Sequence, residues 1–319
     1  MNMFKKVLAS SAIAIAALGL TSAATVAYAD GERFVLVSHA PDSDSWWNTI
    51  KNGLALAGKQ VGATVEYRNP PTGDIGDMAR IIEQATASKP DGIITTIADM
   101  DVLSGPIKAA VDQGVPVIII NSGTPEQAAE LGALMYLGQP EYDAGLAAGK
   151  RAKRDGVGSF LCVNHVITNP VVAERCKGFA DGLGVELGKS MIDAGQDPAE
   201  IKNKVKAYLT ANPKTDAVLT LGPTSADPTL IALEEMGLSG EDIYFGTFDL
   251  GTEIVKGIKA GTIRWGIDQQ PFLQSYLPVI VLANYKRFGV LPGNNINSGP
   301  GFVTKDALGK VEEFAGKYR

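Results

Sequence analysis

From Arg33 onward, short apolar runs alternate with longer amphipathic runs, and this alternation constrains the fold more than any other feature. Runs such as residues 34–38 (FVLVS) and 115–120 (VPVIII) are apolar at almost every position, which is typical of parallel strands covered by helices on both faces. The longer runs have the spacing of helices that bury one face. Repeated strand–helix units predict an α/β fold built on doubly wound parallel sheets.

The elements expected from this pattern follow one another with short connections. The expected strands cover residues 34–38, 64–68, 92–96, 115–120, 159–163, 217–221, 243–248, 264–268 and 301–303. The expected helices cover residues 46–61, 76–88, 103–113, 142–154, 171–183, 199–212, 227–236, 252–260 and 271–288. The pattern restarts after Tyr136, so we predict two α/β lobes with a cleft between them.

The first 29 residues have the layout of a secretory signal. Lys5 and Lys6 precede an apolar stretch over residues 7–20, and Ala27-Tyr28-Ala29 forms an A-x-A cleavage site. The apolar stretch is shorter than the roughly 20 residues of a spanning helix, which argues against the alternative of a membrane anchor. We therefore expect export to the periplasm, with the signal peptide cleaved after Ala29.

Composition and motifs exclude several classes of function. The whole chain has 29 Lys and Arg against 35 Asp and Glu and no basic block, so nucleic acid is not expected as a partner. The sequence contains no phosphate-binding loop, no dinucleotide fingerprint after the first strand and no nucleophile elbow. With two histidines in the chain, little general-base capacity is available, and we expect neither catalysis nor a metal or cofactor.

Cys162 and Cys176 are the only cysteines. One is expected near the end of a strand and the other on the following helix, which can approach closely enough for a bridge. Export to an oxidising compartment favours a disulfide, and two buried thiols are the alternative.

Polar residues follow almost every expected strand. Because ligands in parallel α/β sheets bind at the carboxyl ends of strands, these residues predict a ring of hydrogen-bonding groups around the cleft. The ring includes Ser38-His39, Asn121-Ser122, Asn164-His165, Gly222-Pro223, Asp249 and Asp268-Gln269.

Trp46 and Trp47 open the first expected helix. A tryptophan face covers the apolar C–H surface of a sugar or polyol, while polar groups bind its hydroxyls. Neighbours on a helix point about 100° apart, so one of the two is expected to face the cleft while the other packs inward. Burial of both in the core is the alternative.

Three charged residues are candidate ligand contacts. Asp44 and Asp249 can each accept hydrogen bonds from two hydroxyls, and Arg175 can donate a fork of hydrogen bonds to adjacent oxygens. The alternatives are helix capping for the two carboxylates and a solvated salt bridge for Arg175.

Six short passages carry a family resemblance through their order and spacing. They are Asp44-Ser45-Trp46-Trp47, Asn121-Ser122-Gly123, Leu161-Cys162-Val163-Asn164, Arg175-Cys176-Lys177-Gly178-Phe179, Gly246-Thr247-Phe248-Asp249 and Ile267-Asp268-Gln269-Gln270-Pro271. Together they resemble the type I periplasmic substrate-binding proteins of ABC importers, in the ribose-binding branch. The resemblance spans residues 33–303 and is nearest to binders of polyols and less common monosaccharides.

The resemblance implies a ligand-binding set and a hinge. It places Asp44, Trp46, Trp47, Asn121, Ser122, Asn164, Arg175, Asp249 and Gln269 at ligand positions. It implies two lobes joined by three strands near Gly138, Gln270 and Val303. The first lobe would comprise residues 30–137 and 271–302, and the second residues 138–270 and 303–319. Asn121-Ser122 stands where the ribose binders have Asp-Arg, and Gly222 replaces an asparagine, so a hydroxylated ligand other than ribose is expected.

The function implied is that of a periplasmic solute-binding component that closes around a neutral monosaccharide or sugar alcohol. Its partners would be an ABC permease in the inner membrane and, in a sensing role, a chemoreceptor, and the protein is expected to be a monomer. The alternative is a secreted enzyme that acts on carbohydrate. A sugar-responsive transcription regulator is disfavoured because a signal peptide occupies the place of its DNA-binding helices.

Overall fold

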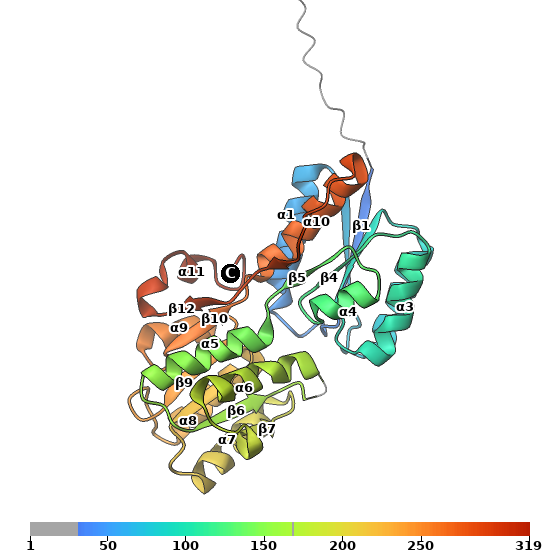
Figure 1. Ribbon diagram of the computed structural model, residues 1–319. Helices are drawn as coiled ribbons and strands as arrows, with labels where there is room; N and C mark the ends of the chain where they lie inside the picture. Colours follow the sequence, from blue (N-terminus) through green and yellow to red (C-terminus); the bar gives the residue numbers. More distant parts are fainter. Residues whose placement is uncertain (1–30, 168) are drawn as a thin grey trace, which may run out of the picture.

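The structure, a computed structural model, describes residues 31–167 and 169–319. The predicted signal peptide and its cleavage after Ala29 lie outside the described residues. Two α/β lobes follow one another along the long axis of the molecule (Figure 1). Within the described ranges, no helix is long and apolar enough to cross a membrane.

The first lobe is built on a six-stranded parallel sheet in the order β11-β5-β4-β3-β1-β2. Its strands are β1 (Arg33–Val37), β2 (Thr64–Arg68), β3 (Gly92–Thr95), β4 (Val117–Ile120), β5 (Met135–Gly138) and β11 (Ile296–Asn297). Its helices are α1 (Trp47–Val61), α2 (Ile75–Ala87), α3 (Met100–Asp112), α4 (Pro125–Glu130) and α10 (Pro271–Phe288).

The second lobe repeats this plan with the order β12-β10-β9-β8-β6-β7, in which β12 alone runs antiparallel to its neighbour. Its strands are β6 (Phe160–Asn164), β7 (Met191–Asp193), β8 (Ala217–Thr220), β9 (Tyr244–Phe248), β10 (Trp265–Asp268) and β12 (Gly301–Val303). Its helices are α5 (Glu141–Arg154), α6 (Pro170–Leu183), α7 (Pro198–Ala211), α8 (Pro223–Glu235), α9 (Thr252–Ala260) and α11 (Gly309–Phe314), with short 3₁₀ turns at Gly188–Ser190 and Lys305–Ala307.

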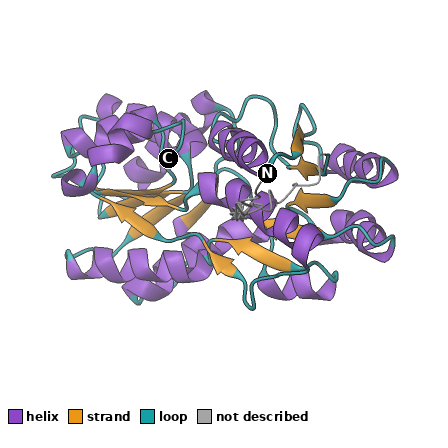
Figure 2. Cartoon of the chain, turned by 90° about the horizontal axis from the view of Figure 1, so that it is seen from above, coloured by secondary structure: helices purple, strands orange, loops and turns teal. Residues whose placement is uncertain are grey.

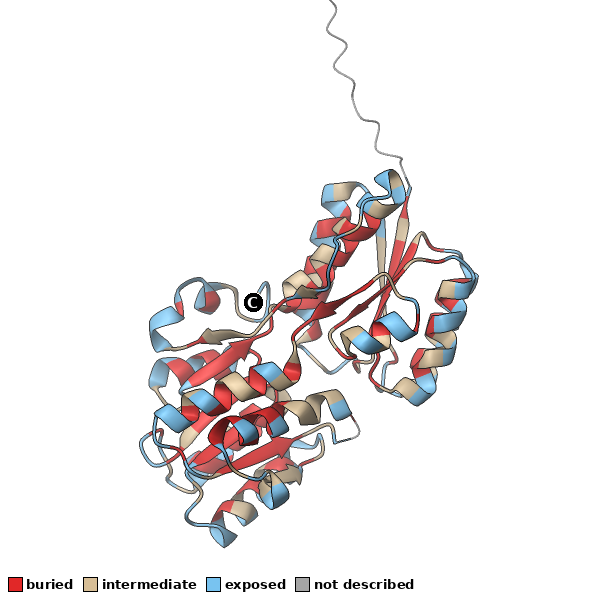
Figure 3. Cartoon of the chain, viewed as in Figure 1, coloured by how far each residue is buried: buried red, intermediate tan, exposed pale blue. Residues whose placement is uncertain are grey.

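Each sheet is covered by helices on both faces (Figure 2), which confirms the predicted fold class. The central strands are therefore buried throughout, as the red strands of Figure 3 show. Two apolar clusters pack against opposite faces of the first sheet, and two more flank the second. Burial on both faces explains why the strands are apolar at nearly every position.

The sequence pattern missed several short elements. Strands β5, β7 and β11, which have four, three and two residues, were not predicted. The helices α4 and α11 were not predicted either, because six residues make fewer than two helical turns.

The chain crosses between the lobes three times, after β5, before α10 and between β11 and β12. The crossings are tied together, because Ser298 N donates to Gly138 O at 2.9 Å and Gln270 Nε2 donates to Ser298 O at 2.6 Å. The strand pairing differs from the sequence prediction at two boundaries between the lobes. Gly138 pairs within the first sheet, and Gly301 and Phe302 pair within the second, because β12 is the edge strand beside β10.

Candidate ligand-binding cleft

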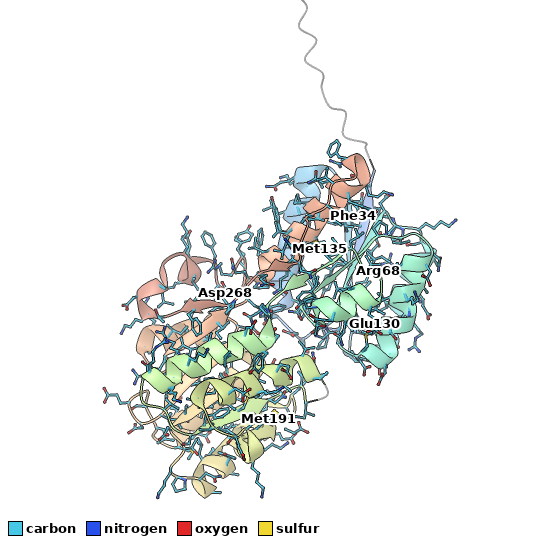
Figure 4. All side chains as sticks on the ribbon, in the orientation of Figure 1. Phe34, Arg68, Glu130, Met135, Met191 and Asp268 are labelled. Carbon is cyan, nitrogen blue, oxygen red and sulfur yellow. A yellow bond between two sulfur atoms is a disulfide. The ribbon has the colours of Figure 1, made fainter. Side chains whose placement is uncertain are left out.

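A cleft of about 900 Å³ lies between the carboxyl ends of the strands of the two lobes. Asp268, labelled in Figure 4, ends β10 where the chain returns toward the first lobe, and it marks the hinge beside this cleft. Parallel strands bring the residues that follow them to one edge of the sheet. Two such edges facing each other explain why residues distant in sequence meet here.

Eight of the nine residues predicted as ligand contacts line this cleft. They are Asp44, Trp46, Trp47, Asn121, Ser122, Arg175, Asp249 and Gln269.

Asn164 differs from the prediction. Its side chain is fully buried and does not line the cleft. Its Oδ1 accepts from Val166 N at 2.8 Å, and its Nδ2 lies 3.7 Å from Met191 Sδ. Asn164 therefore shapes the loop after β6, and the groups presented to the cleft by that loop are those of His165 and Val166.

Arg175 is held by a buried ion pair. Its Nε and Nη2 donate to the two carboxylate oxygens of Glu141, each at 2.7 Å, and its Nη1 donates to Leu221 O at 2.7 Å. The guanidinium also lies 4.6 Å from the centre of the Phe248 ring. Burial by itself lowers the pKa of Arg175, but Glu141, Asp249 and Tyr136 together raise it above its usual value, so the guanidinium stays charged. Of its five N–H groups, those left over can face a ligand.

The sequence did not identify Glu141, although it is the main partner of Arg175 and also lines the cleft. The feature that could have identified Glu141 is its position as the first residue of α5, directly after a crossing between the lobes. Because β5 was not recognised in the sequence, this position after the crossing was not recognised either.

Asp249 directly follows β9 and has a left-handed backbone conformation, with φ of 63°. Its Oδ1 accepts from Gln269 Nε2 at 2.5 Å, and its Oδ2 lies 3.8 Å from Arg175 Nη1. Burial raises the pKa of Asp249 to about 7, against the opposing effect of Arg175. The capping alternative does not hold, because Gly251 is the N-cap of α9.

The two tryptophans lie in different surroundings, as the helix geometry predicts. Trp47 belongs to the core of the first lobe and packs edge-on at 5.3 Å from the ring centres of both His39 and Trp46. Trp46 is only partly buried and lines the cleft. The Trp46 ring is therefore the larger aromatic surface available to a ligand.

Asp44 lies in the turn before α1. Its Oδ1 accepts from Trp46 N at 3.0 Å, and burial raises its pKa, opposed by that hydrogen bond and by Lys51. Asp44 therefore both orients the turn that carries Trp46 and lines the cleft.

An amide network joins the first lobe to the hinge and to the second lobe. Asn121 Nδ2 donates to Oε1 of Gln269 and of Gln274, each at 3.2 Å. Ser122 Oγ donates to Asn121 Oδ1 at 3.2 Å and accepts from Asn169 Nδ2 at 3.3 Å. Since Asn169 is the N-cap of α6, this last hydrogen bond connects the two lobes directly across the cleft.

Cys162 and Cys176 form a disulfide. The bond ties strand β6 to helix α6, directly beside Arg175. Among the residues that the structure describes, no cluster of three or more His, Cys, Asp or Glu side chains could hold a metal ion.

Two doubly wound lobes, three crossings and a polar cleft between strand ends define a two-lobed solute-binding protein. Residues 34–289 match the family described as the periplasmic binding protein domain, and the chain belongs to this family. It is a solute-binding protein that acts outside the cytoplasm, and it is not an enzyme.

Three similar proteins illustrate the relationship. A carbohydrate transporter from Acidothermus cellulolyticus 11B, solved in complex with myo-inositol, is 32% identical; the match covers 90% of this chain and 99% of that one, with a TM-score of 0.83. The xylose/arabinose-binding protein XylF of Sulfolobus acidocaldarius is 23% identical over 86% of this chain and 72% of its own length. A solute-binding protein from Burkholderia graminis C4D1M, solved with D-arabinose, shares the fold at 20% identity, with 87% and 96% of the two chains covered and a TM-score of 0.79.

Proposed function

We propose that the cleft binds a neutral, polyhydroxylated ring compound, a cyclic polyol or a monosaccharide, and that the lobes close around it. The observation that carries this proposal is the pairing of Arg175 with Glu141 beside Asp249. The Arg175 cation is already balanced within the protein, so it offers hydrogen bonds without a free positive charge for an anionic ligand.

The groups around the cleft suit hydroxyls. Asp249 and Asp44 provide acceptors, while Arg175 and the amide of Asn121 provide donors. A hydroxyl both donates and accepts, so a ring that carries several hydroxyls can satisfy both kinds of group. The partly buried face of Trp46 supports a ring whose C–H groups form an apolar patch.

The relatives guide the choice of ligand. The 32% identical protein was solved with myo-inositol, and XylF is named for xylose and arabinose. All three compounds are small and carry adjacent hydroxyls on a ring. We therefore propose myo-inositol and its stereoisomers as the first ligands to test, followed by pentoses.

A thermal-shift screen tests the function, followed by calorimetry of the compounds that stabilise the protein. A ligand at 100 times its dissociation constant stabilises the folded protein by about 2.7 kcal/mol. Stabilisation by one stereochemical series of ring polyols or sugars is the expected result. Open-chain sugar alcohols and amino acids serve as controls, and stabilisation confined to those controls would contradict the proposal.

Further parts of the proposal rest on the sequence. We propose that the signal peptide is removed after Ala29, so that N-terminal sequencing of the exported protein would begin at Asp30. We also propose that the protein is a monomer that presents its closed form to the permease, and to a chemoreceptor where one is present. Size-exclusion chromatography with light scattering tests the monomeric state.

A further inference from the structure

The chain has two histidines, and both line the cleft, one from each lobe. His39 follows β1 in the first lobe, and His165 follows β6 in the second. The sequence predicts both in the polar ring around the cleft but not among the ligand contacts, and neither takes part in the ion pair or the amide network described above.

His165 has one ring nitrogen that is buried without a partner. Its Nδ1 makes no hydrogen bond in the described structure. A proton on Nδ1 would therefore be a buried, unpaired donor, which is costly. The neutral ring consequently carries its proton on Nε2, and the imidazole is a hydrogen-bond donor to the cleft that it lines.

The backbone at Gly222 leaves room for this ring. A Cβ atom at Gly222 would lie 3.4 Å from His165 Cε1 and 3.3 Å from Asp249 Oδ2. The absence of a side chain at this position thus lets the imidazole and the carboxyl group approach the same point at the edge of the second sheet.

His39 is oriented differently. Its Nδ1 lies 2.9 Å from Thr96 Oγ1, and its ring packs against the edge of Trp47. The Thr96 hydroxyl can either donate to Nδ1 or accept from it. Since the tautomer follows the rotation of that hydroxyl, Nε2 of His39 can act either as a donor or as an acceptor.

Both rings are neutral at physiological pH. Burial lowers the pKa of His39 to about 4. Burial, assisted by Arg175, lowers the pKa of His165 to about 4. The other charged groups that line the cleft are Asp44 and Asp99 from the first lobe and Glu141, Lys202, Asp227 and Asp249 from the second.

We propose that His39 and His165 form a pair of neutral imidazoles that recognises ligand hydroxyls from opposite lobes. The inference rests on the proposed function and deepens it. A ligand hydroxyl can accept a hydrogen bond from Nε2 of His165, and it can either donate to or accept from Nε2 of His39. An ammonium group has no acceptor for the Nε2–H of His165, so the pair favours polyols over ammonium analogues of the same size.

Imidazole ¹⁵N NMR of the untagged mature protein tests this directly, because only two rings give signals. Without ligand, we expect two neutral rings between pH 8 and pH 6, with His165 as the Nε2–H tautomer. Saturation with a polyol that stabilises the protein should shift the Nε2 signals of both rings. A His39→Gln variant assigns the signals.

Calorimetry on variants provides the second measurement. His165→Leu and His39→Leu should each weaken polyol binding about three- to tenfold, the range for a single neutral hydrogen bond. His165→Gln keeps a donor and should recover most of the loss. Thr96→Val, which does not line the cleft, should change the tautomer of His39 with a smaller loss of affinity.

The two proposals fail in distinguishable ways. The histidine pair would be overturned if a stabilising polyol shifted the ¹⁵N signals of neither ring or of only one. Unchanged affinity in the leucine variants would overturn it as well. Either result would leave the proposed function intact. A protonated ring at pH 7 would also overturn the pair. No stabilisation by any polyol or sugar would overturn the proposed function and this inference with it.

Discussion

The two lobes have the same fold but present different chemistry to the cleft. The second lobe presents charged groups that are already paired with each other, Arg175 with Glu141 and Asp249 with Gln269 from the adjacent crossing. The first lobe presents an aromatic face and neutral polar groups, chiefly Trp46, Asn121 and Ser122, together with the carboxylate of Asp44. The contrast indicates that the second lobe is the preorganised side of the site.

This division suits a protein that closes around its solute. Groups held in place before binding lose little conformational entropy when the ligand arrives. Trp46, Asn121 and Ser122 on the first lobe are neutral and cost less to remove from water than charges would. A ligand that touches both lobes binds the closed state better and shifts the population toward it. Five predictions test the contrast between the lobes.

The largest effect is expected from breaking the ion pair of the second lobe. Arg175→Met leaves Glu141 buried without its cation, which costs about 3–5 kcal/mol of unfolding free energy. Urea unfolding measures this loss. Lys108→Met is the matched control in the first lobe, because Lys108 and Asp112 are about 60% exposed and such pairs contribute about 0–1 kcal/mol. Equal losses in the two variants would contradict the contrast.

The next effect concerns the disulfide, which only the second lobe contains. Replacing Cys162 and Cys176 together by alanine opens a bridge across 14 residues and should cost about 3 kcal/mol. Thermal unfolding with and without a reducing agent measures it. The reductant should lower the Tm of the wild type toward that of the double variant and leave the variant unchanged. A wild-type Tm close to that of the variant before reduction would refute a stabilising role.

Asp249→Ala should weaken ligand binding by at least about 2 kcal/mol, or roughly thirtyfold, because hydrogen bonds to a charged group are lost. Calorimetry with the ligand found in the screen measures this change. Unchanged affinity would remove Asp249 from the binding site.

Asp249 should also give the unliganded protein a pH dependence. Because its pKa is about 7 in the folded protein and ordinarily 3.8, the folded state holds the proton more tightly than the unfolded state does. This contribution to stability is complete below about pH 4 and is lost as the pH rises through 7. Asp249→Asn should flatten the profile over this window, and an identical profile for variant and wild type would contradict the assignment.

The smallest effect is expected at the direct contact between the lobes. Ser122→Ala removes the hydroxyl that accepts from Asn169 Nδ2, and we expect about 0.5–1.5 kcal/mol weaker ligand binding. A double-mutant cycle with Asn169→Ala isolates the binding free energy that the Ser122–Asn169 hydrogen bond contributes, since Asn169 also caps α6. Additive losses would show that the contact does not contribute to closure.

The sequence determined the architecture of this protein. Strands buried on both faces must be apolar at nearly every position, so the pattern identified most of them and the restart between the lobes. It also located the cleft, because residues that follow parallel strands meet at one edge. Asp44, Asn121 and Asp249 could be placed there from the sequence for this reason. Strands β5, β7 and β11 were not recognised, although other strands of three and four residues were.

The tertiary structure decided what each side chain does there. Arg175 and Glu141 are 34 residues apart, and no local pattern records that one neutralises the other. Asn164 and His165 are adjacent, yet packing beside β7 buries the amide and leaves the imidazole to the cleft. Backbone periodicity follows from local sequence, whereas side-chain direction and long-range pairing follow from which neighbours the fold brings into contact.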